Sequence, residues 1–275
     1  MRADRPFPDS VIALWDQNLT FHYHFLRIGI WDGKQFTIEK TLWSSSERIW
    51  DMQTSPKGRV VSFTSAYPDT DDDKELNVSS LWAADCQTGQ VTLLDQNVAL
   101  YPCWDATGRS LYYVRSIGEG KAGNAIGTLM QMELCDSEGA LLREIPQPKG
   151  LAGIVANEYT KVRCLSDGRV VFSSLELTLP IIGKDIPEYK QLFVLDPARQ
   201  ATVTRLIPRG TLDRTRTFNL DFFEVSPDQS MISLLDDDGR VAVLTLATGD
   251  FIMLQAEDLG PEIVVPVWRF PNELF

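Results

Sequence analysis

The chain has 275 residues, of which 44% are hydrophobic, 10% aromatic and 23% charged. This composition is typical of a folded globular protein and excludes global disorder. The formal net charge of −12 disfavours binding to nucleic acid or to anionic lipid. No apolar run reaches the ~20 residues of a membrane span, and residues 1–8 lack the apolar segment of a secretory signal. We therefore expect a soluble, cytoplasmic protein.

A short turn recurs along the whole chain, with Ser55-Pro-Lys-Gly58 and Ser226-Pro-Asp-Gln229 as its clearest copies. The second residue of each copy stands at positions 8, 56, 106, 166, 227 and 271, so successive turns are 44 to 61 residues apart. Intervals of this size are typical of the blades of a β-propeller.

Each repeat predicts four strands, which we name A to D in chain order. Strand A is expected before the turn, at residues 49–52, 101–104, 222–225 and 264–268. Strand B is expected after it, in β-branched and aromatic runs at residues 11–15, 59–63, 110–114, 169–172 and 231–235. Strands C and D then flank tight turns at residues 31–34, 87–90, 137–140, 197–200 and 248–250, four of which contain the Gly that hairpin turns favour.

No stretch sustains the apolar spacing of a helix for three turns. The fold class predicted is therefore all-β, a β-propeller of four-stranded blades, in a single domain over residues 1–275.

The turn and the apolar strand after it, best seen at residues 55–63 and 226–235, resemble those of the TolB-like propellers, which are related to the WD-repeat fold. That family places Trp two residues before the Pro of the turn. Trp104 alone matches, whereas Thr54, Cys164 and Val225 occupy the other places. The resemblance implies the fold and little about a ligand. The family includes partner-binding propellers and the gating propellers of serine peptidases, but this sequence has no Gly-x-Ser-x-Gly elbow.

Six turns accompany only five B strands, and this mismatch bears on how a ring would close. The first repeat has no room for a strand A, and residues 262–270 read as a strand A with nothing after it. We expect five blades, with the C-terminal strand completing the N-terminal blade and so removing open sheet edges. The alternative is a piece of a longer propeller with two open edges.

The longer connections all fall on one face of the predicted propeller. They are the B–C segments at residues 66–78, 116–126 and 175–189 and the D–A segments at residues 146–157 and 208–218. Binding residues tend to lie in such loops on a rigid scaffold. We expect a protein or peptide partner there.

These loops supply the candidate partner-binding residues. Four arginines within twelve residues either decorate the surface or capture an acidic or phosphorylated peptide. An apolar loop segment around residues 179–183 either caps the core or contacts a partner. The candidates are Arg205, Arg209, Arg214, Arg216, Ile181, Ile182 and Tyr189.

Metal binding has weak support in the sequence. Asp69, Asp71 and Asp73 are spaced like the start of a calcium loop, but the Gly and the distal Glu of that motif are missing. His22 and His24 would share one face of a strand without a third ligand at an obvious spacing. We expect no metal and no cofactor.

The four cysteines lie in apolar strand-like runs without a Cys-x-x-Cys spacing. We interpret Cys86, Cys103, Cys135 and Cys164 as small buried hydrophobic residues. The alternative is a disulfide, which would need an oxidising compartment.

Asp51, Glu224 and Asp105 could form an acid and base pair if their predicted strands converge on the propeller axis. Their offsets from the recurring turn differ, which argues against a shared depth. The function predicted is therefore a non-catalytic protein-interaction or scaffold module, part of a larger assembly. The alternative is a glycoside hydrolase of the five-bladed propeller type.

Overall fold

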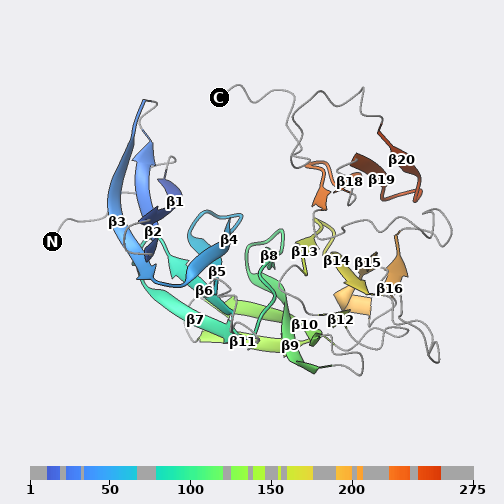
Figure 1. The fold of residues 1–275 in the computed structure, drawn as a ribbon, viewed down its shortest axis with the longest axis horizontal. Coiled ribbons are helices and arrows are strands. Elements are labelled where there is room, and N and C mark those ends of the chain that lie inside the picture. The colour runs from blue at the N-terminus through green and yellow to red at the C-terminus, as the bar shows by residue number, and fades with distance from the viewer. Residues whose placement is uncertain are drawn as a thin grey trace.

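The computed structural model describes residues 11–18, 23–31, 34–66, 79–119, 125–135, 139–145, 154–155, 160–175, 190–199, 203–206, 223–235 and 241–254. They form five antiparallel sheets, which we number in chain order (Figure 1). Sheet 1 contains β1 (Val11–Asn18), β2 (Tyr23–Trp31) and β3 (Phe36–Ser45). Sheet 2 contains β4 (Arg48–Thr54), β5 (Val60–Ala66), β6 (Ser80–Asp85) and β7 (Val91–Gln96).

The next three sheets repeat the same order of strands. Sheet 3 contains β8 (Cys103–Trp104), β9 (Ser110–Glu119), β10 (Ala125–Cys135) and β11 (Gly139–Glu144), with β12 (Ile154–Val155) paired to β10. Sheet 4 contains β13 (Val162–Cys164), β14 (Val170–Leu175), β15 (Lys190–Leu195) and β16 (Val203–Arg205). Sheet 5 contains β17 (Glu224–Val225), β18 (Met231–Leu235), β19 (Val241–Thr245) and β20 (Phe251–Met253).

The predicted A-to-D repeat is confirmed in sheets 2 to 5, and sheet 1 has the predicted strands B, C and D. The long B–C connection predicted at residues 116–126 is wrong in its extent, because β9 continues to Glu119 and β10 begins at Ala125. The described residues contain one helix, the three-residue 3-10 helix η1 (Pro197–Arg199) in the fourth C–D turn. No helix in the described part of the chain is long and apolar enough to span a membrane.

The recurring turn connects each strand A to the strand B that follows it. In four copies the fourth residue donates its N–H to the carbonyl oxygen of the first: Gly58 to Ser55 at 2.7 Å, Gly108 to Asp105 at 3.0 Å, Gly168 to Leu165 at 3.0 Å and Gln229 to Ser226 at 2.8 Å. This fourth residue has a positive φ, which Gly adopts without steric cost. Gln229 takes the same conformation, with a φ of 57°, in the copy at residues 226–229, which lacks Gly.

The apolar core lies between consecutive sheets. Separate clusters join sheets 1 and 2, 2 and 3, 3 and 4, and 4 and 5. Phe172 is fully buried between sheets 3 and 4, and Phe223 is fully buried between sheets 4 and 5. Each blade therefore buries its apolar face against its neighbours in the chain, as repeat architectures require.

Figure 1 shows the sheets following one another along an arc, with β4, β8 and β13 on its inner side and β7, β11 and β16 on its outer side. No core cluster of described residues joins sheet 5 to sheet 1. Residues 262–270, predicted to close the ring, lie outside the described residues. The number of blades and the closure stay predictions.

Candidate functional site

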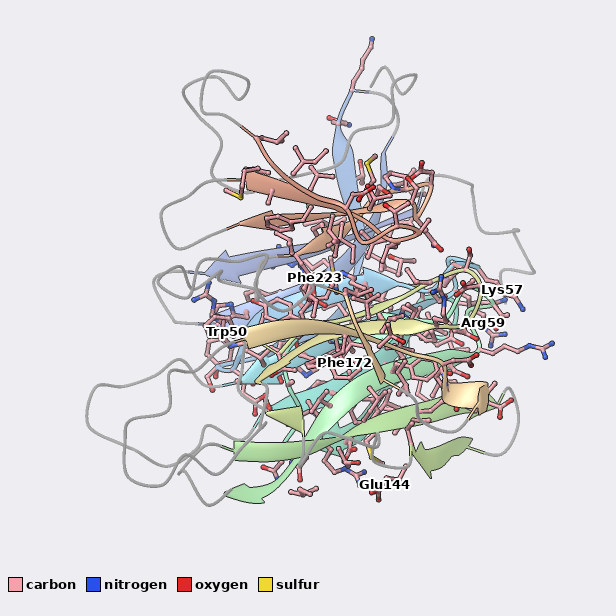
Figure 2. All side chains as sticks on the ribbon, turned by 90° about the vertical axis from the view of Figure 1, so that its right-hand side faces the viewer. Trp50, Lys57, Arg59, Glu144, Phe172 and Phe223 are labelled. Atoms are coloured by element: carbon pink, nitrogen blue, oxygen red, sulfur yellow. A yellow bond between two sulfur atoms is a disulfide. The ribbon has the colours of Figure 1, made fainter. Side chains whose placement is uncertain are left out.

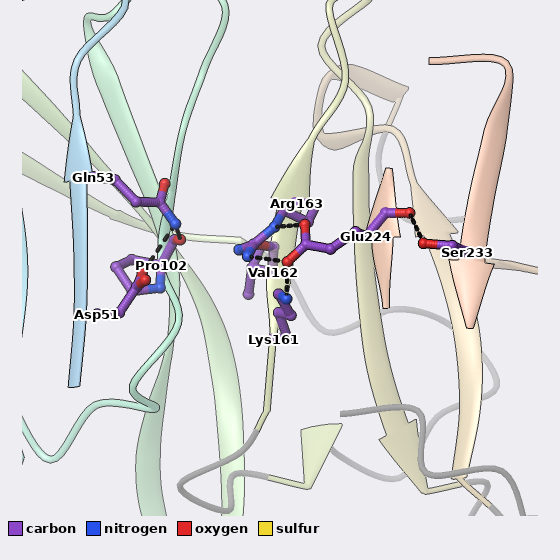
Figure 3. A network of polar contacts seen from close by, with 8 residues as sticks. All are labelled: Asp51, Gln53, Pro102, Lys161, Val162, Arg163, Glu224 and Ser233. Carbon is purple, nitrogen blue, oxygen red and sulfur yellow. Dashed lines mark hydrogen bonds and ion pairs between the residues drawn. The ribbon is translucent and has the colours of Figure 1, made fainter. Parts of the chain in front are cut away.

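The inner strands of sheets 2, 4 and 5 bring charged side chains together near the axis of the arc (Figure 3). Gln53, Arg163 and Glu224 each stand two residues before the first residue of their turn, and Asp51 and Lys161 stand four residues before it. Residues two apart in a strand point to the same side. We call Asp51, Gln53, Lys161, Arg163 and Glu224 the axial cluster.

Glu224 on β17 is held by two cations from sheet 4. Its carboxylate accepts hydrogen bonds from Nε and Nη2 of Arg163, each at 3.1 Å, and it forms an ion pair with Nζ of Lys161. Burial alone would raise the pKa of Glu224, but Arg163 and Lys161 outweigh it and hold the pKa below its usual value. Glu224 is therefore a poor proton donor, and its ion pairs join sheets 4 and 5.

Lys161 is itself buried, with 7% of the residue exposed. Its ammonium lies 5.9 Å from the ring centre of Tyr101 and 5.7 Å from that of Phe223, so aromatic faces stabilise the charge. Burial and the neighbouring Arg163 lower the pKa of Lys161, whereas Glu224 opposes this effect. The lysine contacts sheets 3 and 5 at once.

Asp51 on β4 has a different environment. Its Oδ2 accepts a hydrogen bond of 3.0 Å from Nε2 of Gln53, which also donates to the carbonyl oxygen of Pro102 at 2.8 Å. Among the described residues neither Lys161 nor Arg163 forms an ion pair with Asp51. Burial raises the pKa of Asp51, and the more distant cations and the hydrogen bonds only partly oppose this.

Asp105, the third carboxylate considered for catalysis, lies outside the axial cluster. It is the first residue of the recurring turn and accepts hydrogen bonds from Thr107 Oγ1 at 2.7 Å and from the backbone N–H groups of Arg109 and Ser110 at 2.9 and 3.1 Å. Asp105 therefore shapes the turn. The structure brings Asp51 and Glu224 into one cluster and leaves Asp105 apart.

The interpretation of all four cysteines as unpaired is wrong for two of them. Cys103 on β8 and Cys164 on β13 form a disulfide with a Cα–Cα distance of 6.0 Å. The physical reason is that β8 and β13 are neighbouring inner strands, linked further by the hydrogen bond from Val162 N to Tyr101 O at 3.1 Å. Cys86 is free and buried, as predicted.

Most of the predicted partner-binding residues lie outside the described residues. Arg205 ends β16, where its backbone pairs with Phe193. The predicted residues outside the described ranges are Arg209, Arg214, Arg216, Ile181, Ile182, Tyr189, Asp69, Asp71, Asp73 and His22. His24 is buried on β2. Within the described ranges no group of three or more His, Cys, Asp or Glu residues could hold a metal ion.

Sequence reasoning missed Gln53, Lys161 and Arg163, although the repeat contains the signal that identifies them. Arg163 and Glu224 are 61 residues apart, Cys103 and Cys164 are also 61 apart, and Gln53 and Pro102 are 49 apart. These separations match the interval between successive turns. Residues one repeat apart on strand A are therefore neighbours in space.

Comparison with known proteins gives a fold and no family. No family model and no curated protein matches the chain. Among solved structures it is similar to an oligogalacturonate lyase in complex with manganese, at 8% identity and a TM-score of 0.54 over 90% of this chain and 66% of that one. It is also similar to the β-propeller domain of the Trilobed protease from Pyrococcus furiosus, at 13% identity and a TM-score of 0.49 over 91% of this chain and 68% of that one.

The chain is a β-propeller. The fold that the TolB-like resemblance implied is confirmed by the repeated sheets and by the likeness to the lyase. A further similar structure, the acylaminoacyl peptidase from Pyrococcus horikoshii, matches at 11% identity and a TM-score of 0.48 over 90% of this chain and only 38% of that one. At these identities the likeness concerns the fold alone.

Proposed function

We propose that this propeller is a non-catalytic interaction module within a larger assembly. The observation that supports this proposal best is the engagement of Glu224 by Lys161 and Arg163. Asp105 is likewise engaged in its turn. Two of the three carboxylates available for chemistry therefore serve the scaffold, and the variable part of the molecule is its loops.

The proposed binding face is the one that carries the long B–C and D–A connections. Two of the most exposed large apolar residues in the described ranges lie beside B–C connections: Tyr23 begins β2 and is 47% exposed, and Ile117 lies near the end of β9 and is 62% exposed. Exposed aromatic and aliphatic residues are typical anchors of protein interfaces. Together with the predicted arginine cluster they suit a partner with apolar and acidic groups.

Affinity capture with three charge-reversal substitutions tests this face. Arg209→Glu, Arg214→Glu and Arg216→Glu together should remove the partners that the wild type retains. The matched control is Lys57→Glu at an A–B turn. Trp50 lies near the start of β4, beside a D–A connection, and Figure 2 shows Lys57 at the opposite edge of the molecule from Trp50. A partner set unchanged by the triple substitution would overturn the proposal.

A glycoside hydrolase is the second candidate. One observation favours it: the pKa values of Asp51 and Glu224 move in opposite directions within one cluster, as those of an acid and base pair do. A screen of aryl-glycosides tests it. Hydrolysis that disappears in Glu224→Gln would establish the enzyme and contradict the interaction module.

We also propose that residues 262–270 form the strand A of sheet 1. Strand β1 pairs with β2 on one side and with no described strand on the other, so the inner position of this blade is available. Deleting residues 262–275 should lower the melting temperature of the full chain. An unchanged melting temperature would contradict closure by this segment.

The location of the protein now has two opposed predictions. One is the cytoplasm, and the other is an oxidising compartment, which the disulfide favours. Alkylation of whole cells before lysis, followed by mass spectrometry of the Cys103 and Cys164 peptides, distinguishes the two predictions. Linked peptides support the oxidising compartment, and alkylated peptides support the cytoplasm.

A further inference from the structure

The axial cluster is electrically asymmetric. On the side of sheets 4 and 5, Lys161 and Arg163 share the single carboxylate of Glu224. On the side of sheet 2, Asp51 has hydrogen bonds but no ion pair with a described residue. The cluster thus presents an excess cation on one wall and a lone carboxylate on the other.

The cationic wall has hydrogen-bond donors to spare. A guanidinium has five N–H groups, and Arg163 uses three of them, two on Glu224 and one on the carbonyl oxygen of Val162. The ammonium of Lys161 donates to Glu224 and otherwise faces the rings of Tyr101 and Phe223. Both cations can therefore donate to an additional carboxylate.

The anionic wall has acceptor capacity to spare. A carboxylate can accept about four hydrogen bonds, whereas Asp51 receives one from the side chain of Gln53 and one from the backbone of Met52. Asp51 is partly buried, and a carboxylate withdrawn from solvent without a cation in contact costs a fold some stability. A residue retained at such a cost is a candidate for function.

Solvent reaches this cluster, as a ligand would need to. The side chain of Glu224 is 33% exposed and that of Arg163 is 19% exposed. Figure 3 shows Asp51 and Gln53 on β4 apart from the group formed by Lys161, Arg163 and Glu224, with no contact drawn between the two groups. The two walls are thus separate and both belong to inner strands.

We propose that the axial cluster binds a small zwitterion, an amino carboxylate whose ammonium group meets Asp51 and whose carboxylate meets Lys161 and Arg163. A zwitterion complements both walls at once, whereas a simple anion or a simple cation complements one and is repelled by the other. The remaining N–H groups of Arg163 can donate charge-assisted hydrogen bonds to the carboxylate of the ligand. This site does not depend on the partner-binding face proposed above.

Calorimetric titration of the full chain with a graded series of amino carboxylates tests the proposal. The probes are glycine, β-alanine, 4-aminobutanoate and 6-aminohexanoate, in which the distance between the two charges increases. Acetate and methylammonium are the single-charge controls. At least one zwitterion should bind saturably and at least about tenfold more tightly than either control, a difference of one decade in Kd.

Substitution of the lone carboxylate separates binding from folding. Asp51→Asn should weaken binding of the best probe by about tenfold or more, while raising the melting temperature by ~2–4 °C because a partly buried charge without an ion pair is removed. The matched control Glu133→Gln changes an exposed carboxylate on β10 and should leave binding unchanged.

Three results would overturn the proposal: no saturable binding by any of the four zwitterions, equal binding of acetate and the best zwitterion, or undiminished binding by Asp51→Asn. None of these bears on the partner-binding face, whose test uses the loop arginines. The two proposals can therefore fail independently.

Discussion

The two sides of the propeller axis use polar residues in opposite ways. On the side of β8, β13 and β17, a disulfide joins sheets 3 and 4 and the ion pairs of Glu224 join sheets 4 and 5. On the side of β4, Asp51 is partly buried and has no ion pair with a described residue. The first arrangement stabilises the fold, and the second lowers its stability. The effect of a buried or partly buried charged group on the stability of the fold therefore depends on its partners, and burial alone does not predict it.

Removing the disulfide should produce the largest change. It closes a loop with a sequence separation of 61 residues, and the loss of this constraint is expected to lower the free energy of unfolding by about 4 kcal/mol in the chain-entropy account. Urea denaturation of Cys103→Ser with Cys164→Ser measures it. In reductant, the wild type should have the same free energy of unfolding as the variant, and reductant should not change the free energy of unfolding of the variant. If reductant left the stability of the wild type unchanged, the disulfide would not stabilise the fold, and the proposed contrast between the two sides of the axis would lose this part of its support.

Removing the shared carboxylate should produce the next largest change. Glu224→Gln leaves Lys161 buried without its anion, which we expect to cost about 2 kcal/mol, below the range for fully buried pairs because Glu224 is partly exposed. Urea denaturation at neutral pH measures it, with Glu133→Gln as the exposed control. Equal stability of the two variants would show that the ion pairs contribute nothing.

Removing the lone carboxylate should have the smallest effect and the opposite sign. Asp51→Asn keeps the shape of the side chain and its hydrogen bond with Gln53 while removing a partly buried charge. Its free energy of unfolding should rise by about 1 kcal/mol, a size common for single stabilising substitutions. Chemical denaturation beside the wild type checks this. A variant less stable than the wild type would mean that Asp51 supports the scaffold as Glu224 does.

The strands and turns could be predicted from sequence because their signals are local. The apolar run at residues 231–235 and the turn around Gly89 were sufficient to place β18 and the second C–D hairpin. Short inner strands carry less of this signal: β13 has three residues and β17 has two, and the sequence gives them little periodicity.

The axial cluster could be predicted only in part, because its contacts join residues one repeat apart. Asp51 and Glu224 were recognised as inner-strand carboxylates, but their cations were not, because Arg163 and Lys161 lie 61 and 63 residues before Glu224. The disulfide was missed for the same reason. Only the register between neighbouring inner strands decides which of these residues meet.

The pH dependence of stability distinguishes the two carboxylates most directly. The native pKa of Asp51 is raised above its usual value of 3.8, so the native state binds the extra proton and stability falls as pH rises through the raised pKa. The native pKa of Glu224 is lowered below its usual value of 4.5, so its stabilisation is present above 4.5 and is lost as pH falls through the lowered pKa. Lys161 and Arg163 act on both carboxylates, whereas the hydrogen bonds from Gln53 and from the backbone of Met52 act on Asp51 alone.

The decisive measurement is the free energy of unfolding of the wild type, Asp51→Asn and Glu224→Gln from acidic to neutral pH. Relative to the wild type, Asp51→Asn should become more stable as pH rises, and Glu224→Gln should become less stable over the same range. If the stability of both variants relative to the wild type changed in the same direction with pH, the account would be contradicted. Asp51 and Glu224 would then both stabilise the fold or both destabilise it.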